Sequence, residues 1–255
     1  MTRTLTLAGA EVARIGLGTN RLRHTRGNVE FIRAAVSAGV GVVDTAHLYT
    51  DGDSETTIGD AVSGGPGSVV VATKGAFSRG QGRREVLGGQ IEESLRRLRT
   101  DRIALYYLHR VDPETSLEES LAVLADYREA GKIAHVGLSE VDIDQIELAR
   151  RIVPIEAVQN RYNLSERGWD DVVDYCAGKG IVFVPFFPLR GDGGRSLGKI
   201  ARRHGATEAQ VTLAWLLARS PTTLPIPGTL SLEHLKENLG ALDLELSAEE
   251  VDALR

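Results

Sequence analysis

The segment NVEFIRAAVSAGVGVVDTA, residues 28–46, contains the unit that decides the fold. Residues 28–38 place apolar side chains at helical spacing, and Gly39 follows as the residue type that most often ends a helix. The β-branched run Val40–Ala46 begins directly after this glycine and predicts a buried strand. A helix followed by a buried strand after one glycine is typical of α/β proteins with parallel strands.

The same alternation extends along the chain. Short apolar runs predict eight strands: Val12–Leu17, Val40–Ala46, Val69–Lys74, Arg102–His109, Ile133–Ser139, Ala157–Arg161, Ile181–Phe187 and Leu224–Pro227. Amphipathic segments between them predict helices, with Gly131 and Gly178 as further C-caps: Asn28–Ala38, Arg83–Arg97, Leu117–Ala130, Asp142–Arg151 and Trp169–Ala177. This pattern predicts an α/β fold, a (β/α)8 TIM barrel. A doubly wound sheet is the alternative, but Gly16-Leu17-Gly18 lacks the third glycine of the dinucleotide-binding fingerprint.

Both ends of the chain carry elements outside this repeat. Arg3–Leu7 and Glu11–Ile15 flank a short turn and predict an N-terminal β-hairpin that closes the bottom of the barrel. Ser231–Leu239 and Ser247–Leu254 each begin with a serine N-cap and predict two C-terminal helices. Because no linker or composition shift interrupts the pattern, residues 1–255 are predicted to form a single domain.

Composition and charge exclude several functional classes. The net charge is −5 and the chain has no long run of Lys or Arg, so neither nucleic acid nor an anionic membrane is expected as a partner. The N-terminus does not resemble a signal peptide, and no apolar stretch reaches the roughly 20 residues of a membrane span. A cytoplasmic protein that binds small molecules is therefore expected. The single cysteine, Cys176, is predicted to be a buried thiol in a helix, and the His and Cys spacing does not support a metal site.

Ionisable residues follow the predicted strands at the ends where a barrel carries its chemistry. The second strand ends near Asp44, with Tyr49 shortly after it, the third ends in Lys74, and the fourth ends in His109. Each residue alone could be a turn cap, a solvated charge, a core histidine or loop packing. Charge directly after buried strands is costly unless it is paired, so their joint occurrence favours one site.

These four side chains support proton transfer to a carbonyl oxygen. A phenol ordinarily ionises near pH 10, and an ammonium group held beside it favours the phenolate, which makes the phenol a better proton donor. Asp44 would orient Lys74, and His109 would hold the carbonyl oxygen near Tyr49. Since no Ser or Cys nucleophile has an evident base, the reaction needs an external electron donor, and hydride from a nicotinamide is the natural one.

At this point the sequence resembles the aldo-keto reductase family. The resemblance begins with Val43-Asp44-Thr45-Ala46-His47-Leu48-Tyr49 and the following Ser54-Glu55. It continues, in the same order as in the family, through further motifs over essentially the whole chain: Ala72-Thr73-Lys74, Tyr107-Leu108-His109-Arg110, Gly131–Ser139, Val158–Asn163 and Ile226-Pro227-Gly228-Thr229.

The resemblance implies that NADP(H) binds first, across the barrel mouth, and reduces an aldehyde or ketone carbonyl by hydride transfer while Tyr49 protonates the oxygen. Asp44, Tyr49, Lys74 and His109 match the family's catalytic tetrad. Ser139 and Gln159 match its carboxamide ligands, and Phe186 matches the ring that stacks on nicotinamide. The remaining residues expected to bind the cofactor are Pro188, Leu189, Gly191, Pro227, Gly228, Thr229, Ser231, His234, Glu237 and Asn238.

Three departures from the family pattern limit this transfer. Glu140 stands where the family usually has Asn, which places a carboxylate near the expected site. Gly228 and His234 occupy positions where many relatives carry Lys and Arg for the 2′-phosphate, so NAD(H) is not excluded. Thr229 and Ser231 could be simple helix caps. A short loop before Arg195 and the lack of a long C-terminal tail predict an open site for varied small carbonyl compounds.

Two other functions fit the same sequence. The chain could be a barrel that binds NADP(H) and reports redox state with little turnover. It could also be an isomerase or aldolase that forms a Schiff base through Lys74. A monomer is expected because relatives are often monomeric.

Overall fold

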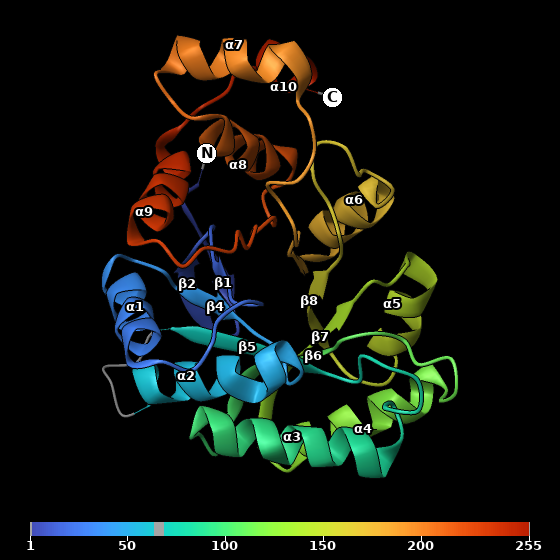
Figure 1. Ribbon diagram of the computed structural model, residues 1–255. Helices are drawn as coiled ribbons and strands as arrows, with labels where there is room; N and C mark the ends of the chain where they lie inside the picture. The colour runs from blue at the N-terminus through green and yellow to red at the C-terminus, as the bar shows by residue number, and fades with distance from the viewer. Residues whose placement is uncertain (1, 64–68, 255) are drawn as a thin grey trace.

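A computed structural model describes residues 2–63 and 69–254, and a curled parallel sheet forms the centre of this part of the chain (Figure 1). The strand order is β3-β4-β5-β6-β7-β8-β9, in which each strand pairs with the next along the chain. The strands are β3 (Leu17–Gly18), β4 (Val42–Asp44), β5 (Val70–Gly75), β6 (Ile103–Leu108), β7 (Ile133–Ser139), β8 (Ile155–Gln159) and β9 (Val182–Phe183). The predicted strands from Val40–Ala46 to Ile181–Phe187 therefore occur as β4 to β9, and β4, β6 and β9 are shorter than expected.

The predicted eighth strand, Leu224–Pro227, closes the barrel through scattered bonds instead of a continuous ladder. The amides of Leu224 and Ile226 donate to the carbonyls of Phe183, at the end of β9, and Pro185. The carbonyls of Pro225 and Pro227 accept from the amides of Gly16 and Gly18. Because proline has no backbone N–H, Pro225 and Pro227 accept these hydrogen bonds but donate none in return. The pairing with β3 is therefore one-sided. A Cβ on Gly18 would lie 2.8 Å from the Ile226 carbonyl, so glycine permits this closure.

The predicted first strand, Val12–Leu17, is wrong as a single element. Its first part belongs to β2 (Ala10–Ala13), which pairs antiparallel with β1 (Thr4–Leu7), and only β3 enters the barrel. The hairpin prediction is confirmed, and the turn between its strands has positive φ at Ala8 (51°) and Gly9 (76°). The apolar run is thus divided between the hairpin and the barrel sheet. Leu7 and Val12 of the hairpin cover one end of the barrel interior.

Helices surround the sheet (Figure 1). They are α1 (Arg26–Ser37), α2 (Asp53–Val62), α3 (Arg84–Leu98), α4 (Leu117–Glu129), α5 (Ile143–Arg150), α6 (Asp170–Lys179), α7 (Gly194–His204), α8 (Glu208–Arg219), α9 (Leu232–Gly240) and α10 (Ala248–Asp252), with 3₁₀ turns η1 (Tyr49–Gly52) and η2 (Ala241–Asp243). The serines predicted to cap α9 and α10 do so. The predicted C-cap at Gly178 is wrong, because α6 continues to Lys179 and its C-cap is Gly180, which has the left-handed φ of 68°.

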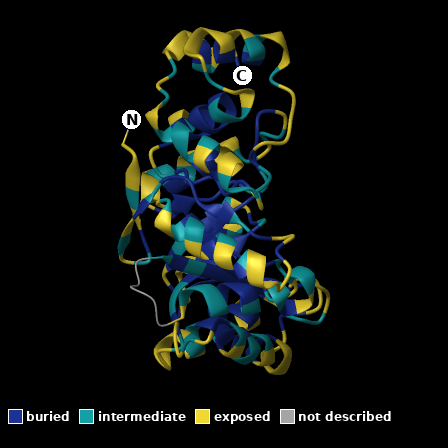
Figure 2. Ribbon diagram, turned by 60° about the vertical axis from the view of Figure 1, so that its left-hand side comes forward, coloured by how far each residue is buried: buried dark blue, intermediate teal, exposed yellow. Residues whose placement is uncertain are grey.

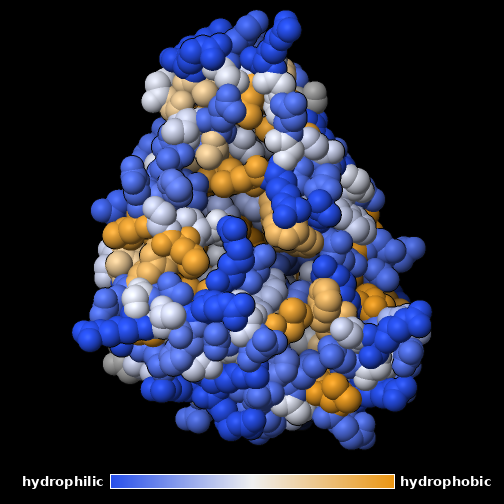
Figure 3. Space-filling model, viewed as in Figure 1, coloured by the Kyte–Doolittle hydropathy of each residue, from blue (hydrophilic) through white to orange (hydrophobic). Residues whose placement is uncertain are grey.

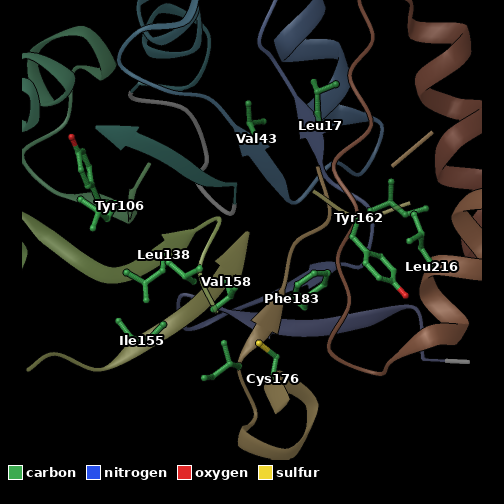
Figure 4. Close-up of a cluster of buried hydrophobic side chains, with 14 of the residues drawn as sticks. Leu17, Val43, Tyr106, Leu138, Ile155, Val158, Tyr162, Cys176, Phe183 and Leu216 are labelled. Carbon is green, nitrogen blue, oxygen red and sulfur yellow. The ribbon is translucent and has the colours of Figure 1, made fainter. Parts of the chain in front are cut away.

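Side chains alternate between two cores, as the period of a strand requires. Inward residues such as Val42, Tyr107 and Ala157 fill the barrel interior, whereas Val43 and Val158 pack against the helices. Figure 2 shows the central strands buried and most exposed residues on the surrounding helices. Figure 4 shows part of the outer core. This alternation fixes which strand residues can reach the open end of the barrel.

Two further sequence predictions bear on the whole chain. Cys176 is buried in α6 within the outer core, and burial raises the pKa of its thiol to about 12 (Figure 4). Among the described residues, no helix is long and apolar enough to cross a membrane. The prediction of one domain over residues 1–255 includes residues 1, 64–68 and 255, which lie outside the described part, and it stays a prediction.

Candidate active site

A pocket of about 680 Å³ opens at the carboxyl ends of the strands. Figure 3 shows this face of the molecule, hollowed near its centre. Most of the predicted site residues meet in this pocket. Those that line it are Asp44, Tyr49, His109, Ser139, Gln159, Phe186, Pro188, Leu189, Pro227 and Gly228.

The polar residues that the strands contribute to this site each occupy the last inward-facing position of their strand. Asp44 comes two residues after Val42, and His109 comes two residues after Tyr107, so each continues a row that begins in the barrel core. Lys74 follows Ala72 in the same way, although it lies beneath the pocket surface and is fully buried. Because every second residue of a strand faces the barrel interior, these residues from separate strands together form one polar layer.

Asp44 and Lys74 form a buried ion pair at the base of the pocket. Lys74 Nζ donates to Asp44 Oδ1 over 2.5 Å and to the Thr45 carbonyl over 2.7 Å. Gln159 Nε2 donates to the other oxygen of Asp44 over 2.8 Å. Burial raises the pKa of Asp44, while Lys74 and Gln159 act in the opposite direction. The predicted pairing of Lys74 with Asp44 is present.

Tyr49 lies above this pair on η1, and its ring centroid is 5.2 Å from Lys74 Nζ. The next two residues, Thr50 and Asp51, have φ values of 50° and 57°, a region that costs non-glycine residues about 1–3 kcal/mol each. Arg97 holds this turn because its Nη1 donates to the His47 carbonyl over 3.0 Å and contacts Glu55 at 3.3 Å. A strained backbone thus carries the phenol to the pocket wall.

His109 is a buried neutral imidazole. Burial, together with Lys74 and Arg110, lowers its pKa to about 2. Its ring lies edge-on to Tyr49, with centroids 6.0 Å apart, and 4.9 Å from the ring of Phe77. Its Nδ1 is buried without a hydrogen-bond partner. The ring therefore stays uncharged in the working pH range.

The other predicted cofactor residues do not line this pocket. The Ser231 hydroxyl accepts from the His234 amide as the cap of α9, and the Thr229 hydroxyl accepts from the Ser231 amide. The Glu237 carboxylate accepts from the Thr207 hydroxyl. Gly191, with φ of 109°, lies in the loop before α7, and Asn238 is buried in α9. These contacts neither support nor oppose cofactor binding at these positions.

Glu140 does not place a carboxylate in the pocket. Its backbone has the left-handed φ of 57°, and its Oε1 accepts from the Arg161 amide over 2.6 Å. The Glu140 carboxylate therefore lies outside the pocket lining, although it acts electrostatically on the pocket residue Arg110, whose pKa burial lowers and this carboxylate raises. Among the described residues, no cluster of His, Cys, Asp and Glu side chains could hold a metal ion.

Sequence reasoning missed several residues that line the pocket. Phe77 comes from the loop after β5, and Arg110 follows His109 directly. Arg21 and Arg190 come from loops after β3 and β9. The position of Arg110 beside a predicted strand-end histidine was the available signal, whereas the loop residues reach the pocket only through tertiary folding.

Comparisons with known proteins agree on one family. The model of the Aldo/keto reductase family matches residues 14–196 and 192–255. Pyridoxine 4-dehydrogenase of Escherichia coli K12 is 35% identical over 278 residues, which covers 98% of this chain and 96% of that protein. An uncharacterized oxidoreductase of Schizosaccharomyces pombe is 36% identical over 221 residues, which covers 82% of this chain and 72% of that protein.

Solved structures give the same result. The thermostable aldo-keto reductase Tm1743, crystallised with the inhibitor epalrestat, superposes with a TM-score of 0.91 at 32% identity, covering 99% of this chain and 98% of that one. An aldo/keto reductase from Klebsiella pneumoniae, in complex with NADP and acetate, superposes with a TM-score of 0.89 at 30% identity, covering 100% and 94%. The chain therefore belongs to the aldo/keto reductase family of enzymes, built on a (β/α)8 barrel.

Proposed function

We propose that the chain is an NADP(H)-dependent reductase that converts aldehydes or ketones to alcohols, with Tyr49 as the general acid. Family membership and the NADP-bound structure from Klebsiella pneumoniae support the cofactor and the reaction class. One observation carries the assignment of the acid. His109 has a pKa of about 2, so near neutral pH it holds no exchangeable positive charge, and the neighbouring phenol is left as the proton source.

The pocket lining fits a nicotinamide cofactor. Phe186 offers a ring face, and Ser139 and Gln159 offer a hydroxyl and an amide in the same lining. Gly228 lies so close to the Gly18 carbonyl that a Cβ would be 3.3 Å from it, which leaves bare backbone at the wall. When bound, the cofactor supplies a hydride to the carbonyl carbon. Thr229, Ser231 and His234 would contact its phosphates near the N-terminus of α9.

The proton moves from Tyr49 to the carbonyl oxygen. As the carbon gains a hydride, the oxygen gains negative charge and takes the phenol proton, which leaves a phenolate. Lys74, whose Nζ lies 5.2 Å from the ring centroid, stabilises that phenolate electrostatically. Asp44 keeps the ammonium in place, since its Oδ1 accepts from Nζ. The phenolate then regains a proton from solvent.

His109 positions the carbonyl oxygen. A neutral imidazole donates one hydrogen bond, and Nδ1 is buried without a partner, so Nε2 is the nitrogen left to donate to a ligand. Burial lowers the pKa of His109, so the ring is not converted to an imidazolium, which would bind anions of any kind. The oxygen is thereby held between His109 and Tyr49, whose rings face each other edge-on.

The geometry disfavours a Schiff base at Lys74. Its side chain is fully buried, and it is hydrogen-bonded to Asp44 and to the Thr45 carbonyl. A substrate carbonyl would have to displace this ion pair to reach the amine. A barrel that binds NADP(H) with little turnover keeps the same pocket, so turnover itself separates the two functions.

The first experiment measures NADPH oxidation at about 340 nm with a panel of aromatic and aliphatic aldehydes. We expect aldehyde-dependent oxidation in the wild type, and its loss in Tyr49→Phe with NADPH binding retained. NADPH binding without turnover on any aldehyde would support the regulatory barrel instead. Turnover that persists in Tyr49→Phe would overturn the assignment of the acid.

A further inference from the structure

Arg110 is a pocket residue that the proposed chemistry does not use. It follows His109 at the end of β6, lines the pocket and is half-buried. Its Nη1 donates to the His109 carbonyl over 2.6 Å and to the Ser139 hydroxyl over 3.1 Å. Both acceptors are uncharged, and both bonds leave from the same nitrogen. Within the described residues, Arg110 forms no ion pair with a carboxylate and leaves Nε and Nη2 without a protein acceptor.

Other arginines of low exposure are compensated differently. Arg97 pairs with Glu55 and Glu93, and Arg219 pairs with Asp170 and Asp174. The fully buried Arg14 pairs with no acid in the described part of the chain, but its Nε and Nη2 donate to three carbonyl oxygens. Arg110 has neither an ion pair nor a full set of carbonyl acceptors among the described residues, although the Glu140 carboxylate acts on it electrostatically in the direction that raises its pKa. Burial has the larger effect and lowers its pKa, which records the cost of keeping this cation partly dehydrated.

The surroundings of Arg110 fit a planar anion. Its guanidinium lies 5.4 Å from the ring of Phe77 and 5.9 Å from the ring of Phe186. Phe77 also contacts His109, so the cation is next to the position proposed for the substrate oxygen. A guanidinium fork with free N–H groups matches a carboxylate in two parallel hydrogen bonds.

Apart from the Asp44–Lys74 ion pair, the charged residues that line the pocket are positive. Of the described residues that line the pocket, Asp44 is the one acidic residue, and Lys74 neutralises it. Arg21, Arg110 and Arg190 are the other charged lining residues, all positive. A pocket with this lining attracts an anionic substrate electrostatically, whereas a neutral substrate experiences no such attraction.

We propose that Arg110 binds an anionic group of the substrate, so that carbonyl compounds carrying a carboxylate are the preferred substrate class. This inference rests on the proposed carbonyl reduction. The carbonyl oxygen lies at Tyr49 and His109, the carboxylate at Arg110, and the body of the substrate beside the ring of Phe77, which leaves the ring of Phe186 to the nicotinamide. Arg110 is thus a specificity-determining residue that acts on binding and leaves the proton transfer to Tyr49.

The test compares 4-carboxybenzaldehyde with its methyl ester, because both have an electron-withdrawing group at the same ring position and only one is charged. The variants are Arg110→Gln, which removes the charge, and Arg110→Lys, which keeps it without the fork. Arg102→Gln is the matched control, since Arg102 is exposed and lies before the opposite end of the same strand. Circular dichroism checks that each variant is folded.

We expect the wild type to prefer the acid in kcat/KM. Arg110→Gln should lower kcat/KM for the acid by roughly ten- to a hundredfold, mainly through KM, which corresponds to the loss of a charge-assisted pair. The ester should change by less than about threefold on the same scale. Arg110→Lys should fall in between, and Arg102→Gln should match the wild type. Added salt should weaken turnover of the acid more than that of the ester.

A binding measurement separates this role from a role in cofactor binding. Benzoate should inhibit reduction of the ester by the wild type and inhibit Arg110→Gln far less, while NADPH affinity stays the same in both. Equal preference for acid and ester in the wild type would overturn the inference, as would an equal loss on both substrates or a tenfold loss of NADPH affinity in Arg110→Gln. If neither aldehyde is reduced by the wild type, the proposed carbonyl reduction itself fails.

Discussion

Replacing Lys74 by methionine tests the buried pair at the base of the site. Methionine has nearly the length of lysine but no charge, so packing in the fully buried position changes little while Asp44 loses its counterion. Gln159 remains as the partner of one carboxylate oxygen. Breaking a buried ion pair from one side typically costs about 3–5 kcal/mol. With about 2–4 °C per kcal/mol for a chain of this size, the melting temperature should fall by roughly 6–20 °C.

The pH dependence of Lys74→Met carries a definite sign. Burial already raises the pKa of Asp44, and removal of Lys74 removes an influence that lowers it. The folded state then holds a proton that the unfolded state releases, so the unfolding free energy decreases as pH rises through the folded pKa and is recovered at acidic pH. The loss of stability should therefore be smaller at about pH 5 than at about pH 8.

Urea denaturation of the wild type, Lys74→Met, Asp44→Asn and the double variant measures this coupling. The double variant removes both charges and should regain much of the stability that Lys74→Met loses. Activity should fall in each variant that lacks Lys74, because the phenolate of Tyr49 loses its neighbouring cation. A Lys74→Met protein as stable as the wild type at about pH 8 would refute the argument that Asp44 depends on this ammonium.

Four further predictions use other parts of the structure. Tyr49→Phe should lower kcat/KM by about two to four powers of ten. Its unfolding free energy, measured in urea, should change by less than about 0.5 kcal/mol, because the hydroxyl bonds to no described residue. A Tyr49→Phe variant that retains most of its aldehyde reduction would contradict the mechanism. The pKa of His109 is depressed to about 2, so this histidine favours folding at neutral pH and opposes it as pH falls below about 6.5. His109→Gln should therefore lose less stability than the wild type between about pH 7 and pH 5, and parallel losses in urea would exclude this origin. Cys176 should resist a thiol reagent such as DTNB until the protein unfolds, and rapid labelling of the native protein would contradict its burial. Fluorescence titration should show tighter binding of NADPH than NADH by a modest margin, because Gly228 and His234 stand where many relatives carry Lys and Arg; an NADH preference would overturn this expectation.

The sequence by itself determined the residues at the ends of the strands. Asp44, Lys74 and His109 each follow a β-branched or aromatic run at a spacing of two from a core residue, and a parallel barrel brings such positions to one rim. Tyr49 could be assigned because it follows the same motif as Asp44. The hairpin and the two serine-capped helices were predictable for the same reason, since their signals are local.

Only the tertiary structure decided what surrounds these side chains. The neutrality of His109 depends on burial and on Lys74 and Arg110, which come together from two strands. Glu140 turns away to the Arg161 amide, a contact that no spacing in the sequence indicates. The one-sided closure of the barrel at Pro225 and Pro227, and the lack of an ion pair at Arg110 within the described part of the chain, likewise depend on which groups are near in space. Local sequence fixes strand periodicity, but burial and charge depend on distant segments that meet only in the folded chain.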